Sequence, residues 1–125
     1  MNNQYLLYAA ALLIIAIGAA HSYLGERYLL IRLLRRDDLP QLFGGTEFTK
    51  RTLRFAWHIT TVAWLGFAGV LIAIARDVTT PAVLGAIVGG TFLIHFGIAL
   101  LGSRGRHYSW VVFLAIGILS LLATR

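Results

Sequence analysis

The chain has 125 residues, of which 58% are hydrophobic and only 13% are charged, and its net charge is +6. Soluble domains carry about 25% charged residues, so this composition excludes an ordinary soluble protein and favours a single membrane domain, residues 1–125. There is no cysteine, which excludes disulfides and thiolate metal sites. The basic residues flank apolar runs and form no single patch, so we expect no nucleic-acid partner.

Four apolar runs are long enough to cross a membrane as helices. A hydrocarbon core of about 30 Å takes about 20 helical residues, and the runs lack the alternation of barrel strands. The predicted spans are residues 5–25, 53–75, 79–102 and 107–123. Short connections join the last three, so sequential helices should be antiparallel neighbours. We therefore predict an all-α membrane protein, folded as a four-transmembrane-helix antiparallel bundle.

The first run, residues 5–25, raises the possibility of a signal peptide because "IGAAHS" ends in small residues. The preceding "MNNQ" supplies no positive charge, and the run is longer than the apolar part of a usual signal peptide. We therefore expect a retained helix.

The segment 26–45 that follows is amphipathic. In "RYLLIRLLRRDDLPQLF" leucines alternate in groups with arginines, a pattern that favours an extension of the first helix or an interfacial helix in contact with anionic lipid. Thr46 is positioned to cap the second helix, with Glu47 in its first turn.

The lysines and arginines predict the topology. Nine lie in residues 26–54 and 104–106, and only Arg76 and Arg125 lie in the segments on the other side. Because cytoplasmic loops are enriched in these residues, both termini should lie outside the cytoplasm, in a bacterial-type inner (plasma) membrane.

The four histidines are all near the predicted cytoplasmic ends of the spans. His21, His58, His95 and His107 each belong to a different helix and lie within a few turns of the cytoplasmic charges. Polar side chains avoid lipid, so the first three are expected to face inward. The sequence thus predicts a histidine cluster in the cytoplasmic leaflet.

One interpretation of this cluster is a heme b site for membrane electron transfer. In a sequential bundle the first and third helices share a diagonal, so His21 and His95 would ligate iron from opposite sides. Gly18 and Gly25 would leave a flat surface for the porphyrin, and Arg54 and Arg104 would meet its propionates. The partner would then be a quinone or a membrane redox protein.

Two other interpretations stay open. A non-heme transition-metal site, for Fe or Zn, would use His21, His58 and His95 with Glu26 or His107 as a further ligand. Alternatively, the protein is a cofactor-free subunit or scaffold in which Glu26 pairs with Arg54. Glycine-rich helix faces are typical of close packing in lipid and make a homo-oligomer a further possible assembly.

Overall fold

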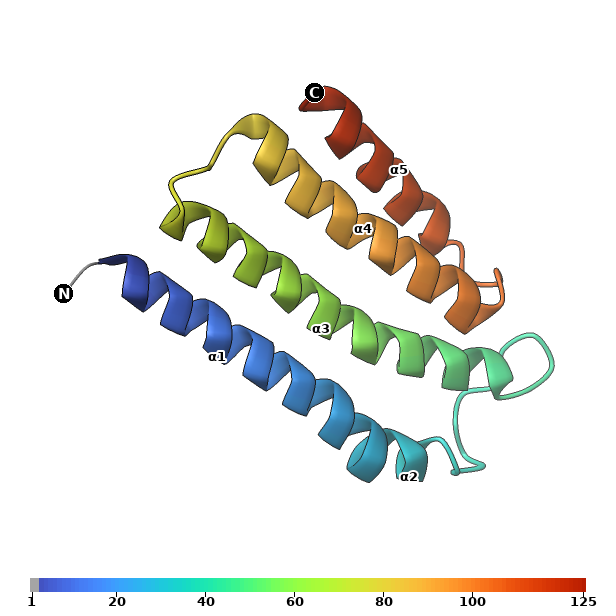
Figure 1. Cartoon of the computed structure of the whole chain (residues 1–125). Helices are drawn as coiled ribbons and strands as arrows, with labels where there is room; N and C mark the ends of the chain where they lie inside the picture. The colour runs from blue at the N-terminus through green and yellow to red at the C-terminus, as the bar shows by residue number, and fades with distance from the viewer. Residues whose placement is uncertain (1–2) are drawn as a thin grey trace.

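The first helical segment is a continuous rod. The structure, a computed structural model, describes residues 3–125. Helix α1 (Asn3–Leu24) passes into a π-helical stretch, η1 (Gly25–Leu30), and ends in one further turn, α2 (Ile31–Leu33) (Figure 1). The start of the predicted amphipathic segment is therefore an extension of the first helix. The π-helical stretch shifts the helical register directly after residue 24, which changes the direction in which Glu26 and its neighbours point.

Residues 34–46 form turns and bends that lead to the second long helix, α3 (Glu47–Ala75). This helix begins earlier than residue 53, the expected start of the second span. Thr46 is at its N-cap position, although its side chain makes no capping bond. Instead the Thr49 hydroxyl donates to the Pro40 carbonyl over 2.7 Å. Earlier in the connection, Arg36 donates to Asp38 over 2.8 Å, and this hydrogen bond lowers the pKa of the Asp38 carboxyl.

The last two helices follow tight turns. Thr80 caps α4 (Pro81–Ser103) by accepting from the Val83 amide, and the proline at the first helical position has no N–H to satisfy. Arg104 ends α4 in a left-handed conformation with φ of 52°, and Gly105 continues the turn with φ of 75°. Helix α5 (Ser109–Ala123) then returns beside α4.

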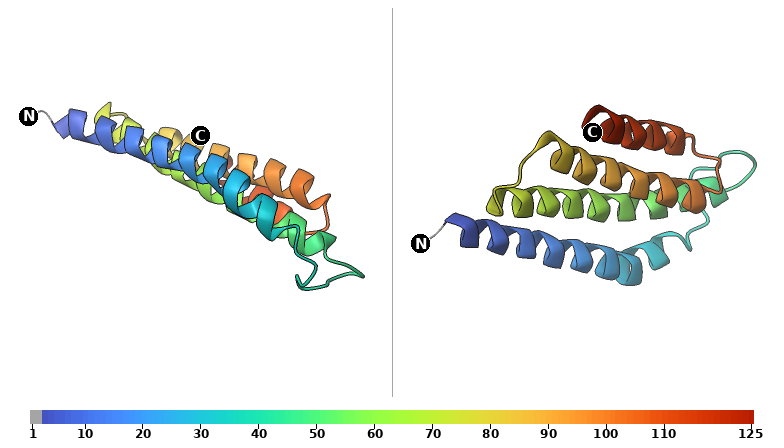
Figure 2. Two further views of the ribbon diagram at one scale, coloured as in Figure 1. Left: turned by 90° about the horizontal axis from the view of Figure 1, so that it is seen from below. Right: turned by 45° about the horizontal axis from the view of Figure 1, so that its top comes forward.

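The four long helices form one curved layer. Helix α1 packs on α3, α3 on α4, and α4 on α5, while no Cα atom of α1 lies within 8 Å of α4 or α5 among residues 3–125. Figure 2 shows the helices side by side in one view and overlapping as a thin slab in the other. The ring of contacts that a four-helix bundle needs is open between α1 and α5, so the predicted closed bundle is not confirmed.

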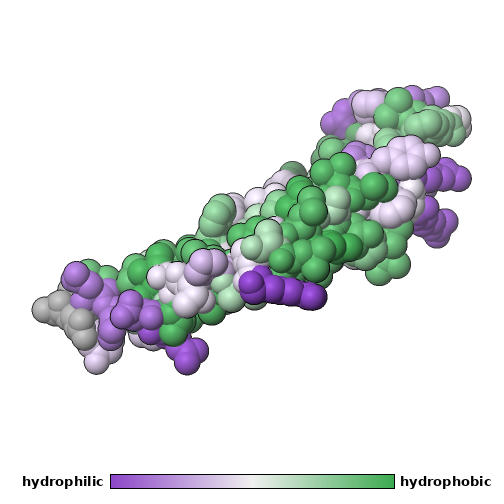
Figure 3. Space-filling view, turned by 90° about the horizontal axis from the view of Figure 1, so that it is seen from above, coloured by the Kyte–Doolittle hydropathy of each residue, from purple (hydrophilic) through white to green (hydrophobic). Residues whose placement is uncertain are grey.

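Three helical segments are long and apolar enough to cross a membrane: residues 3–33, α3 and α4. Helix α5 is apolar but has only 15 residues. Figure 3 shows hydrophobic residues over the middle of the molecule and hydrophilic residues mainly toward its two ends. The start of α1 and the end of α5 lie at one end of the layer, and α2, the start of α3 and the α4–α5 turn lie at the other. We call the latter the basic end, because nine of the eleven lysines and arginines belong to these segments and the connections beside them.

Candidate functional site

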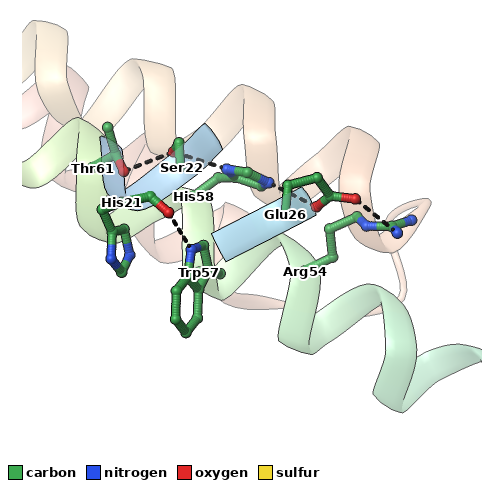
Figure 4. A network of polar contacts seen from close by, with 7 residues as sticks. All are labelled: His21, Ser22, Glu26, Arg54, Trp57, His58 and Thr61. Atoms are coloured by element: carbon green, nitrogen blue, oxygen red, sulfur yellow. Dashed lines mark hydrogen bonds and ion pairs between the residues drawn. The ribbon is translucent and has the colours of Figure 1, made fainter. Parts of the chain in front are cut away.

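His58 is the centre of a polar network between α1 and α3 (Figure 4). Its Nε2 lies 3.3 Å from Oε2 of Glu26, and its Nδ1 lies 3.0 Å from the Ser22 hydroxyl. Ser22 and Glu26 are four residues apart along the first rod, so both side chains can reach the His58 ring. The imidazole is therefore held at both nitrogens by side chains of the opposing helix.

Glu26 binds a second partner at the outer end of this network. Its Oε1 forms an ion pair with Nη2 of Arg54 at 3.0 Å, and Arg54 is one helical turn before His58 on α3. The Arg54 side chain is 51% exposed and that of Glu26 is 31% exposed, so the pair lies at the edge of the helix interface. The Glu26–Arg54 pair expected for a cofactor-free protein is thus present.

The inner end of the network consists of two hydroxyl groups and a backbone carbonyl. Ser22 Oγ lies 2.8 Å from Oγ1 of Thr61, and the Thr61 hydroxyl lies 3.3 Å from the carbonyl oxygen of Gly18. Gly18 and Glu26 are eight residues apart, so the network extends about 12 Å along the rod, at 1.5 Å per helical residue. It is a hydrogen-bonded chain that leads from the basic end into the apolar part of the layer.

His21 lies outside this chain, in a packing contact with Trp57. The two rings stack with centroids 4.3 Å apart and an angle of 5° between their planes. The indole Nε1 also donates to the His21 carbonyl over 3.1 Å. Gly25 makes room for the indole, because a Cβ atom at this position would overlap the Trp57 ring. The Nε2 atom of His21 is buried without a hydrogen-bond partner among the described residues.

His95 is buried in the α3–α4 interface with 4% of its surface exposed. Its Nε2 lies 3.1 Å from the carbonyl oxygen of Ile59, which can only accept, so the ring proton is on Nε2. Phe92 and Phe113 lie against the ring, with centroids 5.3 and 5.5 Å away. The surroundings of His95 are those of a packed core residue.

His107 lies in the α4–α5 turn. Its Nδ1 is 2.8 Å from the Ser109 hydroxyl, and its ring contacts the edge of Phe55 at a centroid distance of 5.2 Å. All four histidines are thus on α3 or in contact with it, but each at a different place. No group of three or more His, Asp or Glu residues within residues 3–125 is arranged to hold a metal ion. Only Glu26 and His58, of the five predicted metal ligands, lie together.

The two predicted heme ligands are not brought together in this arrangement. His21 and His95 belong to α1 and α4, and α3 lies between these helices, so the diagonal approach expected in a bundle does not occur. The predicted porphyrin surface is also filled: Gly25 packs on Trp57, and a Cβ atom at Gly18 would lie 3.4 Å from Thr61. Arg54 is engaged with Glu26, and Arg104 forms the left-handed end of α4.

Three residues of the site were not predicted as functional: Ser22, Thr61 and Trp57. Spacing gave a usable signal for the first two, since Ser22 is one turn from Glu26 and Thr61 is one turn from His58. Trp57 lies near basic residues in the sequence, where tryptophan is common simply because it favours the membrane interface. Its role in packing depends on the facing Gly25, which only the helix pairing reveals.

Comparisons with protein families, with curated proteins and with solved structures found no match to this chain.

Proposed function

We propose that this chain is a proton-responsive membrane protein with four transmembrane helices, in which His58 takes up a proton on the cytoplasmic side. The observation that carries the proposal is the chain of hydrogen bonds from Glu26 through His58 and Ser22 to Thr61. No cofactor is needed for this function.

The network satisfies its donors with His58 either neutral or protonated. With a neutral ring, Nε2–H donates to Glu26, Ser22 donates to Nδ1, and Thr61 donates to Ser22. With a charged ring, Nδ1–H donates to Ser22, whose hydroxyl then turns to Thr61. Thr61 in turn donates to the Gly18 carbonyl. Protonation thus reverses the His58–Ser22 and Ser22–Thr61 bonds and turns the Thr61 hydroxyl to the Gly18 carbonyl. No buried donor is left unpaired, which would cost about 1–3 kcal/mol.

Charges of both signs surround His58. Glu26 contacts the imidazole directly, and Arg54, one turn away on the same helix, is paired with Glu26. Four further charged residues lie around the same end of α3: Arg35, Glu47, Lys50 and Arg51. Reversal of the chain changes the hydrogen bonds between α1 and α3, so the contact between these helices is the element expected to respond.

We expect NMR of ¹⁵N-histidine-labelled protein in detergent to follow this protonation. The signals missing from His58→Gln should change from the Nε2-protonated neutral form to the doubly protonated form as the sample is acidified. Tryptophan emission should change together with these signals. The same emission change should be seen in His21→Gln, which removes direct quenching of the stacked Trp57. A His58 ring that stays in one form throughout, or an emission change that survives in His58→Gln, would contradict the proposal.

The orientation in the membrane is part of the same proposal. We place both termini outside a bacterial-type inner membrane and the basic end in the cytoplasm, because nine of eleven lysines and arginines are then cytoplasmic. The absence of cysteine allows a test without background labelling. We expect Arg125→Cys to react with an impermeant maleimide in intact spheroplasts, and Phe43→Cys, at an 80% exposed position, only after lysis. Equal labelling of both variants before lysis would refute this topology.

Heme b, with a quinone or redox partner, and a non-heme Fe or Zn site have weaker support. Each needs His21 to meet an imidazole from which it is now separated by packing. A Soret band in the purified protein that is lost in both His21→Ala and His95→Ala would favour electron transfer over proton response. Stoichiometric metal lost in His58→Ala and His21→Ala alike would favour the metal site.

A further inference from the structure

A cavity of about 600 Å³ lies at the basic end, between α2, the start of α3 and the end of α4. This volume falls within the usual range of small-molecule pockets, about 300–1,000 Å³. The cavity borders on His58 and Arg54, but its other lining residues take no part in the hydrogen-bonded chain.

The lining is strongly cationic. Four basic side chains face a single carboxylate, that of Glu47. Two of the four are already paired: Arg51 with Glu47 at 3.6 Å, and Arg54 with Glu26. Arg35 and Lys50 make no ion pair with any residue in the range 3–125. The cavity therefore presents two cations whose charge no protein carboxylate balances.

Apart from His58, the remaining lining is apolar and reaches the outer surface of the helices. Leu34 and Phe55 are buried, whereas Leu101 lines the cavity with 77% of its surface exposed. Leu101 is on α4, near the turn into Arg104, so this exposed side chain lies close to the level of the head groups in the proposed orientation. A ligand that fills the cavity would meet positive charge on one side and hydrocarbon on the other.

We infer that this cavity binds the phosphate head group of an anionic membrane lipid, with the acyl chains leaving past Leu101. Arginine binds phosphate through parallel N–H bonds, and lysine supplies a point charge. A wholly polar anion would leave the apolar wall unused, whereas a lipid uses both surfaces. The inference rests on the proposed membrane location but not on protonation of His58.

The test is a titration of delipidated protein in neutral detergent with short-chain phosphatidylglycerol, followed by the thermal unfolding midpoint. Because a ligand that binds only the folded protein stabilises it, we expect the midpoint to rise with lipid concentration. Short-chain phosphatidylcholine, with the same phosphate but no net charge, should have little effect. In Arg35→Gln/Lys50→Gln the apparent affinity for phosphatidylglycerol should fall about tenfold or more.

Arg32→Gln/Arg106→Gln is the matched control, because it removes the same charge from exposed residues of the basic end that do not line the cavity. An equal loss of affinity in this control would mean general attraction to a basic surface and would overturn the site. Equal stabilisation by inorganic phosphate would also overturn the lipid assignment. Since the titration is done in detergent near pH 8, its failure would leave the His58 proposal and the topology standing.

Discussion

Replacing Gly25 with alanine is expected to lower the free energy of unfolding by about 2 kcal/mol, although alanine is the better helix former. The helix preference of alanine over glycine is worth about 1 kcal/mol in favour of the variant. Against this, the new methyl group would overlap the indole of Trp57. The indole is fixed by its stack on His21 and its bond to the His21 carbonyl, so it cannot simply turn away. Overpacking costs typically about 1–3 kcal/mol, and because the indole is held in place we expect the upper value, which leaves a net loss of about 2 kcal/mol.

The matched control is Gly90→Ala, because a Cβ atom at Gly90 of α4 would meet nothing within 4 Å. This variant should be unchanged or slightly stabilised. Unfolding of both variants by SDS in mixed micelles measures the difference. The double variant Gly25→Ala/Trp57→Ala should lose less stability than the two single changes added together, because the clash is then absent. Equal effects of Gly25→Ala and Gly90→Ala would show that the α1–α3 contact is not as described.

Replacing His95 with alanine is expected to cost about 2–3 kcal/mol through the cavity left between α3 and α4. His95→Phe should stay within about 1 kcal/mol of the wild type, because phenyl fills a similar volume between Phe92 and Phe113. It also removes the Nδ1 atom, which has no hydrogen-bond partner among residues 3–125. The half-exposed His107 is the control, and His107→Ala should cost less than 1 kcal/mol.

The phenylalanine variant separates packing from ligation. A core role predicts that His95→Phe folds and unfolds like the wild type in the same SDS titration. If His95 bound heme or a metal ion, both His95→Phe and His95→Ala would lose that group, together with any stability that it provides. Large destabilisation by both variants would therefore refute the core role.

Helix positions could be predicted from the sequence, but their arrangement could not. Long uncharged runs indicate helices whatever their neighbours are, and the four runs correspond to α1, α3, α4 and α5. Closure into a ring depends on which faces pack together. Most of the surface of α4 is apolar, and His95, its predicted inward residue, does not by itself indicate which helix it faces. The packing faces are set instead by glycines at which two helices approach closely. At Gly117 of α5, a Cβ atom would lie 2.8 Å from Leu93 and 3.2 Å from the Gly89 carbonyl of α4.

For the site, the level of the histidines along the helices was predictable, but their partners were not. Counting residues from the nearest charges placed the histidines near the basic end, and opposite charge suggested the Glu26–Arg54 pair that the structure contains. The direction of each ring around its helix was not predictable. The π-helical stretch after Leu24 changes that direction for Glu26, and nothing in "GERYLL" marks it in advance. His21 and His58 therefore meet different partners although both lie in the α1–α3 interface.

The order of helices in the layer also has a consequence for biosynthesis. Helix α3 packs on α1, α4 on α3, and α5 on α4, so each long helix contacts the long helix before it in the chain. None of these contacts requires a helix that is synthesised later. Every interface can therefore form as soon as the next hairpin has left the ribosome. Local contacts of this kind close short loops and favour rapid folding. A truncated chain that stops after residue 103 would retain the complete α1–α3 and α3–α4 interfaces, and with them the network around His58.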